Sequence, residues 1–292
     1  MIARTSPPAK LNLFLEIPAR RDDGYHEIDT VMVAIDWRDE LTVQPIDAPE
    51  VQLSTRWLPS VESVAAELGL ADQLDPTADD PAPAILQIPR DETNLVARAL
   101  ECFRKKFGIE SGFRADLGKR IPAGAGMGGA SSAAAHAISC AAQIHQVTNE
   151  VDSLHEIAAS VGSDVPFFLP QVDARSAAQA AWARGRGEIL TPIGMRTCIH
   201  FVVAFPPHSL STGGVYGRLN IPRNPLDSTG FRDALIKGDA AAMAASMMNR
   251  LSEPALEILP PLGELLESLW QSGLEPCQLT GSGSACFGIA RD

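Results

Sequence analysis

A glycine-rich stretch that leads into an alanine-rich segment is the strongest constraint on how this chain folds. Residues 119–132 read KRIPAGAGMGGASS, and alanine is frequent from there to His145. Glycine permits positive φ angles and lets backbone amides come close to a ligand. A helix N-terminus adds unsatisfied N–H groups and a partial positive charge. The stretch therefore predicts a phosphate-binding loop followed by a helix. Ser131 and Ser132 either cap this helix or bind phosphate oxygen.

The two common glycine-rich phosphate motifs fit this loop poorly. The residues after the glycines are Ala-Ser, which excludes the GxxxxGK[ST] pattern of P-loop enzymes. Gly124, Gly126 and Gly129 do match GxGxxG, but a dinucleotide-binding fold needs an apolar strand that runs directly into the glycines. Here two basic residues and a proline stand at 119–122. A nicotinamide or flavin oxidoreductase is therefore a distant alternative.

Composition excludes several other classes of protein. The 292 residues are 45% hydrophobic, which disfavours disorder and suggests about two domains. With 24 basic and 36 acidic residues the net charge is −12, which disfavours nucleic acid and anionic membrane surfaces as partners. The five cysteines form no CxxC pair, and no apolar run approaches the ~20 residues that span a bilayer. We therefore expect a cytoplasmic protein without a zinc cluster or a disulfide framework.

The N-terminal segment predicts a strand and a hairpin turn. Three leucines alternate with other residues over 9–17, so Lys10 and Asn12 share one face of the strand. That face is either solvated or functional. An Asp-Gly step then predicts a hairpin connection, which places Arg20, Arg21, Tyr25 and His26 near one loop. The strand pattern continues over 28–43.

Further segments predict helices around one conspicuous carboxylate. The spacing from Thr93 predicts an amphipathic helix, and 113–117 alternates as a strand. Ser153 and Glu156 form a capping-box pattern for a helix that Gly162 can end. Asp164 follows, ahead of the apolar run VPFFL. It is either a positioned acid or the cap of the next turn.

The remaining segments are interpreted more simply. Residues 59–84 look like an inserted surface excursion with a short helix, and their acidic run favours solvated side chains over a metal site. The segment RGRGE at 184–188 either supplies cations or forms a surface turn. A buried strand is expected at 201–205, and helices at 240–251, with core methionines, and 262–269. A second glycine turn, 280–284, leads into a C-terminal apolar strand.

Four segments, PAKLNLFL with DDGYHEI, IPAGAGMGGASS, GSDVPFF and LTGSGSACF, occur in an order that resembles the GHMP kinase superfamily. Within it, the chain resembles the kinases that phosphorylate 4-diphosphocytidyl-2-C-methyl-D-erythritol. The resemblance implies an α+β, two-domain fold. Residues 1–166 would form a nucleotide domain like domain 2 of ribosomal protein S5, and 167–292 a ferredoxin-like substrate domain without the family's last helix. The active site would lie between the two domains.

The resemblance also implies roles for individual residues. Lys10 and Asp164 would be catalytic, with Asp164 also contacting the substrate. ATP, which carries Mg²⁺, would be bound by Asn94, Pro122, Gly124, Gly126, Gly128, Gly129, Ser131 and Ser132, of which Ser132 is a candidate magnesium ligand. The cytidine-containing substrate would contact Asn12, Tyr25, His26, Tyr216 and Thr280, although a core role for Tyr216 stays open. No metal site of the protein's own is expected, and the chain would be a monomer or a weak homodimer.

Two alternatives belong to other substrates or classes. The substrate of a homoserine or mevalonate kinase of the same superfamily has no nucleobase to stack. Tyr25 and His26 would then have no role. A non-catalytic binding protein on the same fold would bind nucleotide without turnover. Lys10 and Asp164 would then have no role.

Overall fold

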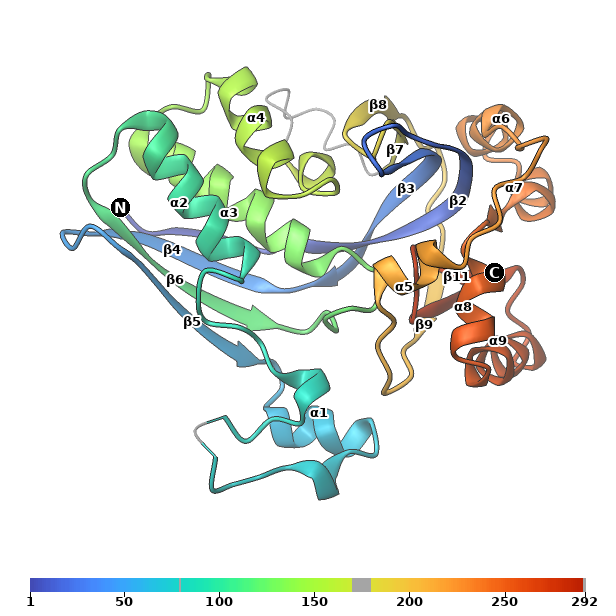
Figure 1. Ribbon diagram of the computed structural model, residues 1–292, viewed down its shortest axis with the longest axis horizontal. Coiled ribbons are helices and arrows are strands. Elements are labelled where there is room, and N and C mark those ends of the chain that lie inside the picture. The colour runs from blue at the N-terminus through green and yellow to red at the C-terminus, as the bar shows by residue number, and fades with distance from the viewer. Residues whose placement is uncertain (79, 170–179, 291–292) are drawn as a thin grey trace. The chain divides into compact units, whose positions relative to one another are not determined.

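The computed structural model of the chain describes residues 1–78, 80–169 and 180–290 (Figure 1). These residues form two compact units. The first unit comprises Met1–Ala9, Ile35–Ala123 and Gly128–Ala177, and the second comprises Lys10–Ala34, Gly124–Met127 and Ala178–Asp292. Two long strands, β2 (Pro8–Arg20) and β3 (His26–Arg38), contribute residues to both units. The domain boundary at residue 166 stays a prediction.

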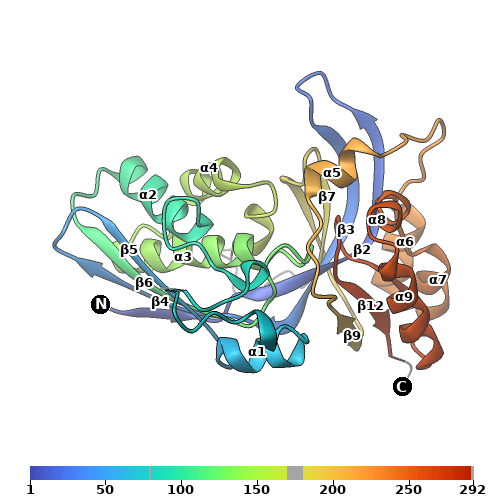
Figure 2. The same cartoon turned by 60° about the horizontal axis from the view of Figure 1, so that its bottom comes forward.

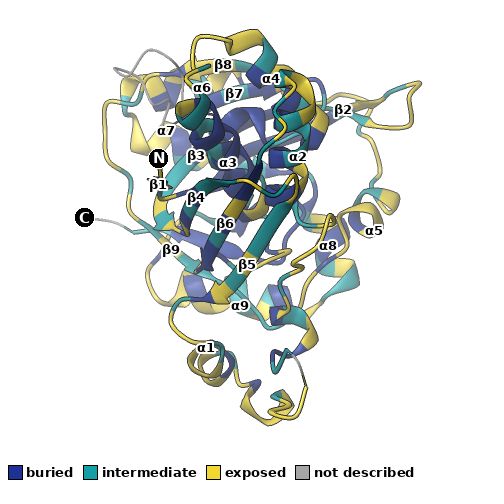
Figure 3. Cartoon of the chain, turned by 90° about the vertical axis from the view of Figure 1, so that its left-hand side faces the viewer, coloured by how far each residue is buried: buried dark blue, intermediate teal, exposed yellow. Residues whose placement is uncertain are grey.

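The first unit is a four-stranded sheet with three helices on one face (Figure 1). The sheet has the order β1-β4-β6-β5, in which only the β5–β6 pair is parallel. Its strands are β1 (Ala3–Thr5), β4 (Glu40–Ile46), β5 (Val51–Trp57) and β6 (Gly112–Lys119), and the helices are α2 (Leu95–Phe107), α3 (Gly129–His145) and α4 (Val151–Val161). Helix α3 is largely buried (Figure 3), and its alanines other than Ala130 are all buried. Their small side chains allow the helix to pack closely against its neighbours.

An excursion after β5 forms a small core of its own within the first unit. It contains α1 (Val61–Glu67) and the 3₁₀ turns η1 (Ala71–Gln73) and η2 (Ala84–Leu86), and α1 is largely exposed (Figure 3). The Trp57 indole donates a hydrogen bond to the Leu86 carbonyl (2.7 Å) over buried Ala65 and Leu70. Asp72 and Asp75 are exposed, whereas Asp79 of the same acidic run lies outside the described residues. The predicted surface excursion is confirmed.

The second unit contains two sheets and a helical layer. A five-stranded sheet has the order β10-β2-β3-β7-β8, and a three-stranded sheet has the order β11-β12-β9. Figure 2 shows α9 beside β12, and α8 contacts α9. The apolar core of this unit gathers around Leu15, Ile17 and Leu262. The elements are β7 (Ala180–Arg184), β8 (Ile189–Ile193), β9 (Phe201–Ala204), α5 (Thr212–Gly217), α6 (Thr229–Lys237), α7 (Ala240–Ser246), β10 (Met248–Asn249), α8 (Ser252–Ile258), α9 (Pro261–Gln271), β11 (Cys277–Leu279) and β12 (Cys286–Ile289).

Three local predictions are wrong in detail. Helix α4 begins at Val151, so Ser153 lies inside the first turn and forms no capping box with Glu156, whose carboxylate pairs with Lys106 (2.5 Å). The helix expected over 240–251 ends at Ser246, because the chain then pairs as β10 in parallel with β2. Strand β9 is half-buried rather than buried. In the described part of the chain, no helix is long and apolar enough to cross a membrane.

Candidate active site

The glycine loop adopts backbone conformations that side chains would obstruct. Gly124, Gly126 and Gly128 have φ angles of +67°, +76° and +68°, in the region that favours glycine. A Cβ atom on Gly126 would stand 2.2 Å from the carbonyl oxygen of Thr280, a residue of the same unit. The neighbouring carbonyl of Ala125 accepts a hydrogen bond from the Ala285 amide (3.1 Å). The two glycine turns predicted from the sequence are therefore packed backbone to backbone.

Helix α3 begins at this loop without a side-chain cap. Its N-cap is Gly128, so of the two roles predicted for Ser131 and Ser132, capping the helix or binding phosphate oxygen, the capping role is wrong. The amides of residues 129–131 have no carbonyl one turn earlier to accept them, as at any helix start. Ser132 is fully buried, and its hydroxyl has no hydrogen-bond partner among the described residues. A buried hydroxyl without a partner, in the first turn of a helix whose first amides are also unpaired, fits a site for phosphate oxygen or for a cation.

A buried ion pair fixes residues 119–121, which lead into the glycine loop. The Lys119 ammonium donates to one carboxylate oxygen of Asp39, and the other oxygen accepts the amides of Arg120 (2.7 Å) and Ile121 (2.9 Å). The Lys119 ammonium also lies 3.1 Å from where a Cβ of Gly129 would be. Sequence reasoning missed Asp39. The scarcity of lysine was the only available signal, since five of the 24 basic residues are lysines.

The polar face of β2 is buried rather than solvated. Lys10 and Asn12 expose 3% and 4% of their surface, and the Lys10 ammonium donates to the Asn12 amide oxygen. The backbone N–H of Asn12 donates to the Thr280 hydroxyl (3.0 Å), and the backbone N–H of Lys10 donates to the Met127 carbonyl (2.9 Å). The structure thus brings three predicted site residues, Lys10, Asn12 and Thr280, into one buried cluster of the second unit.

Aromatic side chains gather near the turn between β2 and β3. The ring centroids of His26 and Tyr216 are 4.9 Å apart, and the ring of Tyr25, 54% exposed, faces the guanidinium of Arg186 at 4.9 Å. Partial burial lowers the pKa of His26, and the nearby charge of Arg20 lowers it further. Tyr216 also packs against the apolar core of the second unit, so it touches both His26 and the core.

Three more predicted residues lie in the first unit. Asn94 is the N-cap of α2: its side chain accepts from the Val96 amide (2.9 Å) and donates to the Pro89 carbonyl (2.7 Å). Pro122 is half-buried at the start of the glycine loop. Asp164 is half-buried in the turn after α4. The next turn, η3 (Pro166–Phe168), has Val165 as its N-cap, so Asp164 is not the residue that caps it.

Two family descriptions match the chain: "GHMP kinases N terminal domain" over residues 94–170 and "GHMP kinases C terminal" over residues 231–292. A Rhodopirellula baltica protein named 4-diphosphocytidyl-2-C-methyl-D-erythritol kinase is 46% identical over 98% of this chain and 86% of its own length. A Streptomyces avermitilis protein of the same name is 32% identical, with the same two coverages.

Solved structures of the same kinase and of a related one also resemble this chain. A crystal structure of 4-(cytidine 5′-diphospho)-2C-methyl-D-erythritol kinase superposes with a TM-score of 0.72 at 31% identity, covering 99% of this chain and 90% of that one. A homoserine kinase from Cytophaga hutchinsonii superposes with a TM-score of 0.68 at 15% identity over 99% and 85% of the two chains, which shows a shared fold only. The expected α+β fold is confirmed. The chain belongs to the GHMP kinases, in the family of the 4-diphosphocytidyl-2-C-methyl-D-erythritol kinases, which are small-molecule kinases.

Proposed function

We propose that the chain transfers the γ-phosphoryl group of ATP to the 2-hydroxyl of 4-diphosphocytidyl-2-C-methyl-D-erythritol, a step of the non-mevalonate isoprenoid pathway. The family membership supports a kinase, and the aromatic group at Tyr25, His26 and Tyr216 is the observation that carries the substrate assignment. A cytosine has a face to stack on a ring and an edge to accept or donate hydrogen bonds. The five cysteines are all free, which suits the reducing cytoplasm where we place the reaction.

The nucleotide end of the site fits ATP and its magnesium ion. The net charge of −12 repels phosphate at long range, so binding has to rely on local donors. The glycine loop and the first amides of α3 supply such donors, and the orphaned Ser132 hydroxyl supplies an oxygen for magnesium or phosphate. Magnesium, when bound, neutralises charge on the phosphates. Asn94 would contact the adenine end.

Phosphoryl transfer needs positioning and charge stabilisation more than covalent chemistry. In our proposal Asp164 accepts the proton of the attacking hydroxyl, and Lys10 stabilises negative charge on the transferring group. The hydrogen bond from the Lys10 ammonium to Asn12 restricts the rotamers of the lysine side chain, so the positive charge is held in one place. Thr280 and Asn12, joined by a hydrogen bond, would contact the substrate.

The assay is phosphate transfer from ATP by the purified chain, with the product identified by mass spectrometry. The cytidyl substrate is compared with mevalonate and homoserine, and we expect phosphorylation of the first only. Turnover of mevalonate or homoserine without the cytidyl substrate would contradict the substrate assignment. Nucleotide binding without any turnover would instead favour a non-catalytic protein.

A pair of variants tests the proposed base. Asp164→Asn should lower kcat by at least the ~10²-fold typical of general-base loss, while ATP still binds. Asp152→Asn is the matched control, because it removes the same charge from an exposed position in the first turn of α4. Near-normal turnover by Asp164→Asn would remove Asp164 from this role.

A further inference from the structure

The hairpin turn at 185–188, between β7 and β8, has no role in the function described above. We propose that Arg186, in this turn, is a positioning residue for the substrate's nucleobase: its guanidinium covers one face of the Tyr25 ring and leaves the other face for the base. The inference rests on the proposed function, in which Tyr25 stacks on the cytosine.

The contact between Arg186 and Tyr25 is the first observation behind this proposal. The guanidinium carbon lies 4.9 Å from the centroid of the Tyr25 ring, within the range of a cation–π interaction. The residue nevertheless stays 54% exposed, so the ring retains surface for a second partner. A cation on one face restricts the tilt of the ring. A ring that is already restricted loses less side-chain conformational entropy when the base stacks on it.

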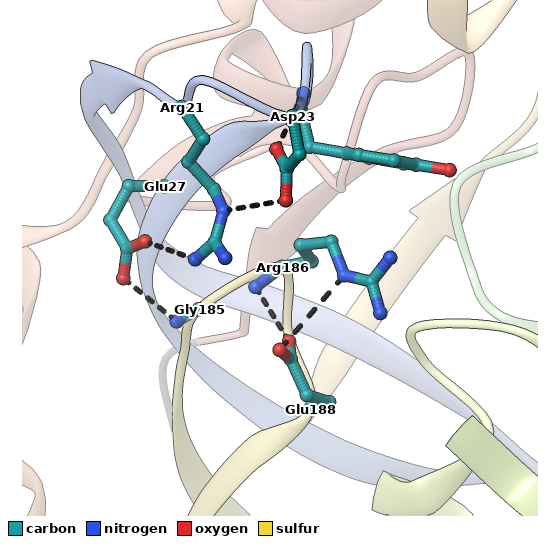
Figure 4. A network of polar contacts seen from close by, with 7 residues as sticks. Arg21, Asp23, Glu27, Gly185, Arg186 and Glu188 are labelled. Atoms are coloured by element: carbon teal, nitrogen blue, oxygen red, sulfur yellow. Dashed lines mark hydrogen bonds and ion pairs between the residues drawn. The ribbon is translucent and has the colours of Figure 1, made fainter. Parts of the chain in front are cut away.

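Hydrogen bonds hold the turn that carries Arg186 against β3 (Figure 4). The Gly185 amide donates to a carboxylate oxygen of Glu27 (3.0 Å), and the Ile28 amide donates to the Gly185 carbonyl (2.9 Å). Within the turn, the Arg186 amide donates to Glu188 (2.6 Å). The backbone at Gly185 and Arg186 is therefore anchored, and the Arg186 side chain extends from a fixed point.

The turn that carries Tyr25 is anchored through the same Glu27 carboxylate (Figure 4). Arg21 donates to Glu27 (2.9 Å) and to Asp23 (3.2 Å), and Asp23 accepts the Tyr25 amide (3.1 Å). Glu27 thus connects the two turns, one through Arg21 and the other through Gly185. The Arg21 guanidinium donates to two carboxylates, those of Glu27 and Asp23. The Arg186 guanidinium forms a longer ion pair with Glu188 (3.9 Å) and also faces the aromatic ring of Tyr25.

Steady-state kinetics of the full chain with the cytidyl substrate test the proposal. Arg186→Ala should raise KM for that substrate by about 2- to 5-fold, the change expected for loss of an exposed cation–π contact, while kcat and KM for ATP stay unchanged. Arg186→Lys keeps a cation and should stay closer to the wild type than Arg186→Ala. In a Tyr25→Leu background, Arg186→Ala should have no further effect, because the ring it orients is gone.

Arg184→Ala is the matched control. Arg184 lies in the same hairpin, and its guanidinium is 4.2 Å from the ring of Trp182 instead of Tyr25. We expect no change in KM for the cytidyl substrate in this variant. An unchanged or lowered KM in Arg186→Ala, an equal rise in Arg184→Ala, or an undiminished effect in the Tyr25→Leu background would each overturn the proposal. A wild-type chain that does not phosphorylate the cytidyl substrate would overturn the proposed function itself.

Discussion

Replacing Ser132 with alanine should separate stability from activity. The Ser132 hydroxyl is fully buried and has no partner among the described residues, so the folded chain carries the cost of desolvating it, about 1–3 kcal/mol. Alanine keeps the helix propensity of α3 and removes that hydroxyl. Ser132→Ala should therefore raise the free energy of unfolding by up to about that amount. For a chain this long, each kcal/mol corresponds to roughly 2–4 °C in Tm.

Activity should change in the opposite direction. If the hydroxyl binds phosphate or magnesium, its loss removes a hydrogen bond to a charged group, about 1.5–3 kcal/mol. That amount corresponds to a roughly 10- to 150-fold lower kcat/KM for ATP. Thermal melts without nucleotide and initial rates with ATP and magnesium measure the two effects.

Ser139→Ala is the control for this experiment, because the Ser139 hydroxyl, on the same helix, already donates to the Ala135 carbonyl (3.1 Å). It should leave kcat/KM unchanged and give no gain in Tm. A Ser132→Ala variant with a lowered Tm and wild-type kinetics would refute the reasoning, because the hydroxyl would then serve the fold and not a ligand.

The other predictions concern the loop and one histidine. Asp39→Asn leaves the buried Lys119 charge uncompensated and should destabilise the fold by about 3–5 kcal/mol in urea denaturation. Gly126→Ala should reduce kcat/KM at least 10-fold, because its Cβ would meet the Thr280 carbonyl oxygen at 2.2 Å; wild-type rates would contradict the close packing. Burial lowers the pKa of His145, so the stability this residue contributes above pH 6.5 is lost as the pH falls through its folded-state pKa. His145→Phe should reduce the stability difference between pH 7.5 and pH 5, and an unchanged difference would exclude this residue as its source.

Local patterns predicted the elements that carry the site. The alternation around Lys10 corresponds to β2, the Asp-Gly step to the turn before β3, and the glycine stretch to the loop before α3. Each of these depends on residues adjacent in the chain, where backbone preference and side-chain period act directly. The same kind of reasoning failed at Ser153, because the helix starts three residues earlier than its capping pattern indicates.

Long-range partners could not be predicted in the same way. Asp39 and Lys119 are 80 residues apart, and nothing in either local segment identifies the other as its partner. The burial of Lys10 and Asn12 was equally hidden, because an alternating strand shows which side chains share a face and not what covers that face. Thr280, which bonds to Asn12 across 268 positions, entered the site only through the family resemblance.

Each of the two compact units is assembled from three separate stretches of chain. A chain divided at residue 166 would have residues 10–34 in its N-terminal fragment. Strands β7 and β10, which pair with β3 and β2, would lie in the C-terminal fragment. Neither half could complete the five-stranded sheet β10-β2-β3-β7-β8 without the other half. A chimaera made by exchange of whole halves would thus join strands of two parents in one sheet, at the β2–β10 and β3–β7 pairs.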